Sequence, residues 1–254
     1  MKSKVLSIGT IAAVLVNISV VGSVSAADEI LTDLSERRFG NGFFFSAEAL
    51  SLQPLRGDGS STSIFSREYT PRLSGGFQLQ NGTGFRVRHW EFDATEATGL
   101  NNNPSSIDTD TLDLEAFREI KLDSGLAVEL SAGARRVNYS DLNFSDASQI
   151  TEFEGWGGVF GIKGTQELFE GISVYGSGRF SVLAGDAIDN GTIENDTSRN
   201  IVEIAAGVEG TFAIGSTEAT VHAGYEWWNW EGFQDNADGA IGFSGFVGGA
   251  TIKF

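Results

Sequence analysis

The chain has 254 residues, a formal net charge of −17 at pH 7 and a sequence pI near 4.4. This acidity argues against nucleic acid as a partner. The absence of cysteine excludes disulfide bonds and thiolate metal sites, and two histidines leave little room for imidazole chemistry. With 33 glycines and 3 prolines, the composition suits a large sheet with long strands.

The first 26 residues have the pattern of a cleavable signal peptide. Lys2 and Lys4 precede an apolar run over residues 8–21, and Val24, Ser25 and Ala26 supply small residues before the cleavage point. An uncleaved membrane helix is the weaker alternative because the apolar run is short for a span. We therefore expect export, with residues 27–40 as a periplasmic N-terminal segment and 41–254 as a single β-barrel.

Short turns alternate with longer polar segments along the rest of the chain. The tight turns lie at 80–84, 122–125, 168–171 and 214–217, and the polar segments cover 57–66, 95–108, 140–155, 185–199 and 231–239. They separate ten expected strands, starting near Phe43, Tyr69, Phe85, Thr111, Leu126, Trp156, Ile172, Ile201, Ala219 and Ala240. Short periplasmic turns, long extracellular loops and an even strand number are typical of an antiparallel, up-and-down transmembrane barrel. One missed hairpin would make the count twelve.

Alternation with a period of two defines two faces on each strand. In the strand that starts at Leu126, Leu130 and Ala132 share one face, while Glu129 and Arg135 share the other. A soluble sandwich or lipocalin-like barrel would also alternate, with its polar face outward. Alternate residues of the last strand, which ends at Phe254, are apolar, and this favours a lipid-facing exterior. The alternation of short turns with long loops favours it too. A group of aromatic residues that fits an interfacial girdle is a third argument for it. That group contains Tyr225, Trp227, Trp228 and Trp230.

Arg118 breaks this pattern, because it shares its parity with apolar residues and would face lipid. Such an arginine in the middle of a bilayer costs about 2–4 kcal/mol. Either Arg118 lies at the periplasmic rim, where its side chain can reach water, or a β-bulge reverses the local facing.

Charged residues gather on the inward parity of several strands. The candidate pore-lining residues are Arg86, Arg88, Asp113, Glu115, Glu129, Arg135, Arg179, Glu203 and Glu209. Such a wall either plugs a narrow barrel with salt bridges or lines an aqueous path, and the sequence leaves both open. With Glu48, Lys163 and Glu226 added, acids outnumber bases, so a conducting pore should prefer cations.

Six segments resemble a known family, the Legionella-type major outer membrane proteins and their pore-forming relatives. They are residues 42–50, 84–93, 112–116, 153–158, 181–185 and 223–230, which read GFFFSAEAL, GFRVRHWEFD, LDLEA, FEGWGG, SVLAG and AGYEWWNW. The resemblance spans most of the expected mature chain. It implies a barrel in the outer membrane of a Gram-negative cell, usually described as pore-forming.

Two functions follow as expectations. The first is a porin-like passive channel for small solutes, preferably cations; the second is a closed structural or adhesive barrel that acts through acidic extracellular loops. We expect no enzyme and no cofactor, because His89 and His222 have opposite predicted facing. The expected partners are outer-membrane lipid, lipopolysaccharide and the barrel-assembly machinery, which would bind at Phe254. Two oxygen-rich loops, at 186–196 and 235–238, are solvated by default, with Ca²⁺ binding as the alternative.

Overall fold

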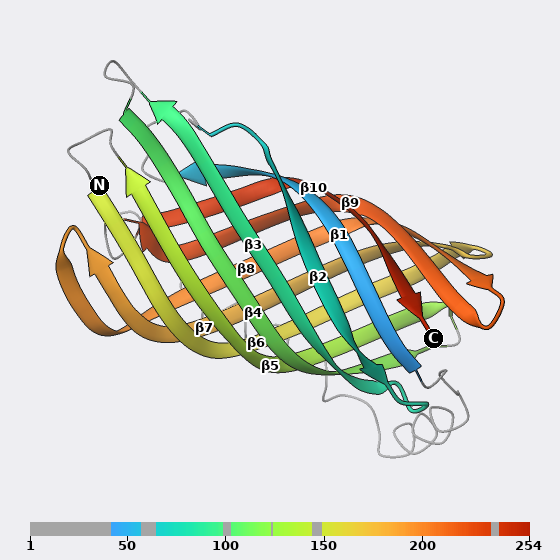
Figure 1. The fold of residues 1–254 in the computed structure, drawn as a ribbon. Coiled ribbons are helices and arrows are strands. Elements are labelled where there is room, and N and C mark those ends of the chain that lie inside the picture. The colour runs from blue at the N-terminus through green and yellow to red at the C-terminus, as the bar shows by residue number, and fades with distance from the viewer. Residues whose placement is uncertain (1–41, 57–64, 99–102, 123, 144–148, 235–238) are drawn as a thin grey trace, which may run out of the picture. The chain divides into compact units, whose positions relative to one another are not determined.

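The computed structural model describes residues 42–254 except 57–64, 99–102, 123, 144–148 and 235–238. Ten antiparallel strands form one closed barrel, in which each strand pairs with its neighbours in sequence and β1 pairs with β10 (Figure 1). The strands are β1 (Gly42–Arg56), β2 (Glu68–Gln78), β3 (Thr83–Thr98), β4 (Asn103–Lys121), β5 (Leu126–Asn143), β6 (Gln149–Phe169), β7 (Ile172–Asp189), β8 (Thr192–Ile214), β9 (Thr217–Gln234) and β10 (Gly239–Lys253). The expected ten-stranded up-and-down barrel is confirmed over these residues.

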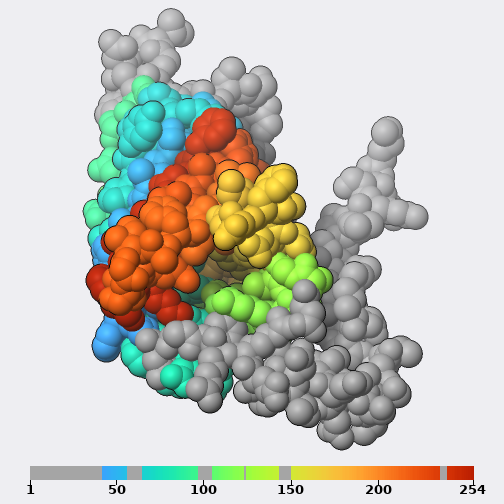
Figure 2. All heavy atoms as spheres, turned by 90° about the vertical axis from the view of Figure 1, so that its right-hand side faces the viewer, coloured from blue at the N-terminus to red at the C-terminus, as the bar shows by residue number. Residues whose placement is uncertain are grey.

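The four predicted tight turns lie at one end of the barrel, which we call the turn end. Each turn contains a glycine with positive φ, a backbone conformation that residues with a Cβ rarely adopt. These glycines are Gly82, Gly125, Gly171 and Gly215. Figure 2 shows this end, where the turns between β4 and β5, β6 and β7, and β8 and β9 (green, gold and orange) lie around the barrel mouth. The N-terminal end of β1 and the C-terminal end of β10 also lie at this end. The opposite end is called the loop end.

Three of the predicted long loops are largely strand. The β3–β4 ladder runs to Thr98 opposite Asn103, and the β5–β6 ladder runs to Asn143 opposite Gln149. Between β7 and β8 the connection is a two-residue turn, in which Asn190 and Gly191 both have positive φ. The loop prediction over 95–108, 140–155 and 185–199 was wrong, because a strand that leaves the bilayer needs no apolar face and continues with Thr, Ser and Asp.

The apolar residues that alternate along the strands lie on the outer face of the barrel, as predicted. Leu130 and Ile204 are among the large apolar side chains exposed on it, and so are Phe246 and Ile252 on β10 and Phe254 directly after it. Arg118 is also exposed on this face, three residues before β4 ends at Lys121, and the ladders on both sides of it run without a bulge. The structure therefore fits the rim position for Arg118 and not the reversed register.

Two members of the expected aromatic girdle point the other way. Tyr225 and Trp227 are exposed on the outer face, whereas Trp228 and Trp230 are buried inside the barrel. The girdle prediction was therefore wrong for Trp228 and Trp230. They share the parity of Glu226, which is buried too, so alternation along β9 decides their facing and not their aromatic character.

The contacts group Phe39–Phe254 into one compact unit. The predicted signal peptide and the segment 27–40 lie outside the described residues, so both stay predictions. Among the described residues, no helix is long and apolar enough to cross a membrane.

Candidate functional site

Two stacked groups of side chains lie in the interior of the barrel. The first, which we call the charged belt, contains Glu48, Arg72, Arg86, Arg88, Asp113, Glu115, Glu129, Arg135, Arg179, Glu203 and Glu226. The second, called the aromatic cluster, contains Trp90, Phe92, Tyr139, Phe153, Trp228, Trp230, Phe233 and Phe243. On β3, Arg86 and Arg88 are followed by Trp90 and Phe92, so the aromatic cluster lies on the loop-end side of the belt.

Neighbouring strands supply one set of ion pairs in the belt. Arg86 faces Glu115 across the β3–β4 ladder and donates to it at 2.8 Å, while Arg135 faces Asp113 across β4–β5 and donates from Nε at 2.7 Å and from Nη2 at 2.9 Å. Arg179 faces Glu203 across β7–β8 and donates at 2.9 Å. These pairs join inward residues of adjacent strands, as their parity and register require.

A second set of ion pairs crosses the lumen between strands that are not neighbours. Arg179 on β7 donates to Asp113 on β4 at 2.6 Å and also to Glu115. Arg135 on β5 donates to Glu203 on β8, and Arg72 on β2 donates to Glu226 on β9 at 2.7 Å. These ion pairs therefore join opposite walls of the barrel.

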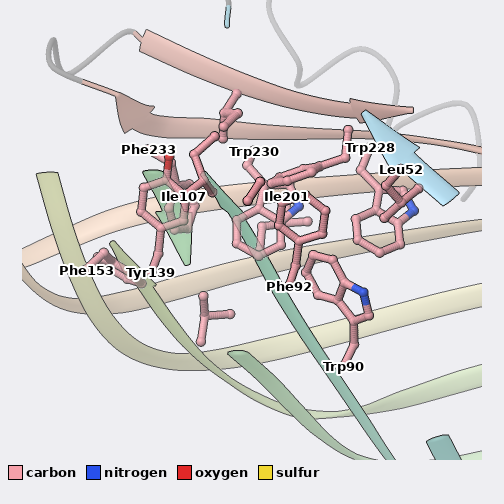
Figure 3. Packing of buried hydrophobic residues seen from close by; sticks show 14 of the residues in the cluster. Leu52, Trp90, Phe92, Ile107, Tyr139, Phe153, Ile201, Trp228, Trp230 and Phe233 are labelled. Carbon is pink, nitrogen blue, oxygen red and sulfur yellow. The ribbon is translucent and has the colours of Figure 1, made fainter. Parts of the chain in front are cut away.

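The aromatic cluster packs inside the barrel on the loop-end side of the belt (Figure 3). Trp90 packs edge-on against Trp228 with ring centroids 4.6 Å apart, and Trp230 packs against Phe233 at 5.0 Å. Such edge-to-face contacts are favourable for aromatic rings beyond the area that they bury. Phe65, from the connection between β1 and β2, adds a further buried ring and accepts a hydrogen bond at its carbonyl from Gln53 Nε2.

The nine candidate pore-lining residues all carry the inward parity, and eight of them belong to the belt. Glu209 lies apart from the belt, toward the turn end, where it accepts a hydrogen bond from Lys163 at 2.7 Å. Side chains are less enclosed in this part of the barrel, since Lys163 is 40% exposed. Whether these residues line a conducting path stays a prediction.

Sequence reasoning missed Arg72 as a member of the site. Arg72 bonds Glu48 and Glu226 and is buried. The inward position of Arg72 was predictable from alternation, because Tyr69 and Leu73 on the same strand are exposed on the opposite face. Pro71 and the shortness of β2 made the alternation hard to recognise.

The two histidines lie on opposite faces of the wall. His89 is exposed on the outside, with Nε2 2.6 Å from Asp110 Oδ2, and His222 points inward, with Nε2 2.9 Å from Glu48 Oε1. They cannot act on one substrate. Among the described residues, no group of three or more His, Asp or Glu side chains is placed to hold a metal ion. The loop at 235–238 lies outside those residues, and Ca²⁺ binding stays a prediction.

A family model described as the Legionella pneumophila major outer membrane protein precursor matches residues 40–244. The chain belongs to this family. As a member, it is an outer-membrane β-barrel protein, which agrees with the apolar outer face and the closed sheet. No curated protein sequence matches the chain.

Several solved outer-membrane structures resemble the barrel of this family member. The translocator domain of the autotransporter NalP from Neisseria meningitidis is 13% identical, with a TM-score of 0.49, over 89% of this chain and 93% of that one. The outer membrane protease OmpT from Escherichia coli is 8% identical, with a TM-score of 0.45, over 85% and 98%. Neisserial surface protein A is 13% identical, with a TM-score of 0.42, over 85% and 100%. At this similarity, neither protease activity nor a translocator role follows.

Proposed function

We propose that this outer-membrane protein is a closed structural barrel that meets its surroundings through the hairpins at its loop end. The observation that carries the proposal is the filled lumen. Arg179 and Arg135 bond carboxylates on the far side of the barrel, and the aromatic cluster covers them from the loop end. Open porins have about 16 to 18 strands, whereas ten strands leave an interior narrow enough for side chains to fill.

The hairpins are the second part of the proposal. The β7–β8 hairpin continues to the turn at Asn190 and Gly191, and exposed acids on it include Asp186, Glu194 and Asp196. The paired strands carry these carboxylates on an exposed hairpin, which suits contact with other surface molecules better than passage of solute. Outer-membrane lipid and lipopolysaccharide are the partners proposed for the apolar wall, and the assembly machinery is the partner proposed for the strand that ends at Phe254.

The channel for small solutes, preferably cations, is the competing proposal. In this conformation it requires Arg179 to leave both Asp113 and Glu115, and Arg135 to leave Glu203. We also propose that the protein is not an enzyme, since its histidines are on opposite faces.

Single-channel recording distinguishes the two functions. Refolded protein is inserted into a planar lipid bilayer in a salt gradient, and the folded state is verified by its heat-dependent mobility on a gel. We expect a silent, correctly folded barrel. Discrete conductance steps with a cation-selective reversal potential would refute closure and establish the channel.

The Glu129→Gln variant adds a matched test, because Glu129 bonds Arg86 within the belt. In a closed barrel, this change lowers stability and leaves the bilayer silent. In a channel, it shifts the ion preference away from cations.

A further inference from the structure

One buried ring in the interior does not come from a strand. Phe65 lies three residues before β2 begins at Glu68, yet it is only 2% exposed and belongs to the cluster of buried apolar residues. Every other described member of that cluster lies on one of the ten strands. A strand residue cannot leave the lumen unless its ladder breaks, whereas Phe65 belongs to none of the described ladders. Its ring can therefore leave the lumen while the sheet stays intact.

Side chains of β1 and β3 hold the chain at residues 65–67, which we call the strap. Gln53 of β1 donates to the carbonyl oxygen of Phe65 at 3.0 Å. Glu96 of β3 accepts from the backbone N–H of Ser66 at 3.0 Å and also from the Ser66 hydroxyl. The strap is therefore tied to the two strands on either side of β2.

Most of these ties lie at the surface. Ser66 and Arg67 are exposed, and Arg67 adds one more bond, to the carbonyl oxygen of Ser51 at 3.3 Å. Surface hydrogen bonds add little net stability, because water replaces either partner when the bond opens. Segments with few apolar contacts and exposed hydrogen bonds are the first to open in a folded protein. The strap is therefore joined to the barrel by one buried ring and by bonds that water can replace.

We propose that the strap is a lid, which opens at the loop end of the lumen while the barrel stays folded. In the closed state, the ring of Phe65 packs into the buried apolar cluster, which also contains Ala94. In the open state the ring leaves, and the part of the cluster next to it faces water. The lid thereby sets whether this end of the barrel presents a polar or an apolar surface. It is distinct from closure by the charged belt, because the belt lies deeper in the lumen and stays in place when the strap opens.

Single cysteines test the lid, because the chain has none of its own. Ala94→Cys places a thiol in the apolar cluster, two residues before Glu96, and Ser181→Cys places one near Arg179 of the belt. Both native residues are buried. The refolded barrel is treated with a water-soluble maleimide, and each labelling rate is divided by the rate of the same variant unfolded in urea.

The two cysteines should differ in their corrected rates. We expect the rate of Ala94→Cys to be about tenfold higher than that of Ser181→Cys, or more, because local opening needs less free energy than unfolding of the barrel. Equal corrected rates would overturn the proposal. The bilayer recording tests the belt and the maleimide tests the lid, so failure of the closed lumen is distinguishable from failure of the lid.

A second change tests whether the bonds of the strap hold the lid. Glu96→Ala removes the acceptor of both Ser66 bonds, and its control, Asp93→Ala, removes the same charge from the outer face of β3. We expect Glu96→Ala to raise the corrected rate of Ala94→Cys several-fold and Asp93→Ala to leave it unchanged, while Ser181→Cys responds to neither. A rise at both cysteines would show general destabilisation, and no rise at Ala94→Cys would show that these bonds do not hold the strap. Either result would contradict the lid.

Discussion

Arg135 and Arg136 are adjacent on β5 but lie on opposite sides of the barrel wall, so they form a matched pair for testing the belt. The Arg135 side chain is 2% exposed, and it bonds Asp113, which is 1% exposed, and Glu203. Arg136 bonds Glu154 at 2.8 Å on the outside, where Glu154 is 67% exposed. Removal of one partner from a buried ion pair costs about 3–5 kcal/mol, whereas an exposed pair contributes about 0–1 kcal/mol. We therefore expect Arg135→Met to be several-fold more destabilising than Arg136→Met.

The assay is urea unfolding and refolding in detergent, followed by tryptophan fluorescence and by gel mobility, with agreement of both directions as the criterion of equilibrium. Glu203→Gln, alone and combined with Arg135→Met, completes a double-mutant cycle. Arg135 and Glu203 share a hydrogen bond. The free energy of unfolding should therefore fall less in the double variant than the sum of its decreases in the two single variants. An Arg135→Met loss below about 1 kcal/mol, or equal to that of Arg136→Met, would refute a stabilising belt.

Three further changes test the packing and the hairpins. Trp230→Ala should cost about 3–5 kcal/mol in the same urea assay, because it empties part of the aromatic cluster, whereas Trp227→Ala on the outer face should cost less. Gly157→Ala should lower refolding yield, since a Cβ there lies 1.8 Å from a backbone oxygen of β7, while Gly164→Ala on the same strand meets open space and should refold normally. Partial desolvation and three nearby acids raise the pKa of Asp108, an exposed residue near the loop end of β4, so its charged form destabilises the folded barrel as pH rises through that pKa. Asp108→Asn should therefore stabilise the barrel at pH 8, and its advantage should shrink on acidification.

The features of this barrel that were predictable from sequence are local. A period of two places Glu129 and Arg135 on one face and Leu130 on the other, and the burial of each follows it. A tight turn between strands needs a residue with positive φ, and Gly82 and Gly125 mark two such turns. These signals involve only a few consecutive residues, so they predicted ten strands and most of the inward charged residues without knowledge of the tertiary structure, although Arg72 was missed.

The prediction failed where composition was given more weight than alternation. Trp228 and Trp230 were assigned to the girdle because aromatic residues gather at membrane interfaces, although both share the parity of Glu226. Asp, Asn and Ser in 185–199 were interpreted as a loop, although Asn190 and Gly191 are a typical two-residue hairpin turn. In both cases the local geometric signal was present and was the better guide.

Which residues pair across the lumen depends on the diameter of the barrel, which is a property of the whole sheet and not of any single strand. Parity and register explain why Arg179 meets Glu203, since the two face each other on adjacent strands. They do not explain why Arg179 also meets Glu115, three strands away, because that contact depends on the diameter of the closed barrel. In a barrel of twelve strands, the same side chains would stand farther apart and could line a water-filled path. Strand number therefore decides whether one set of inward charges locks the lumen or lines a pore, and ten strands bring them within bonding distance.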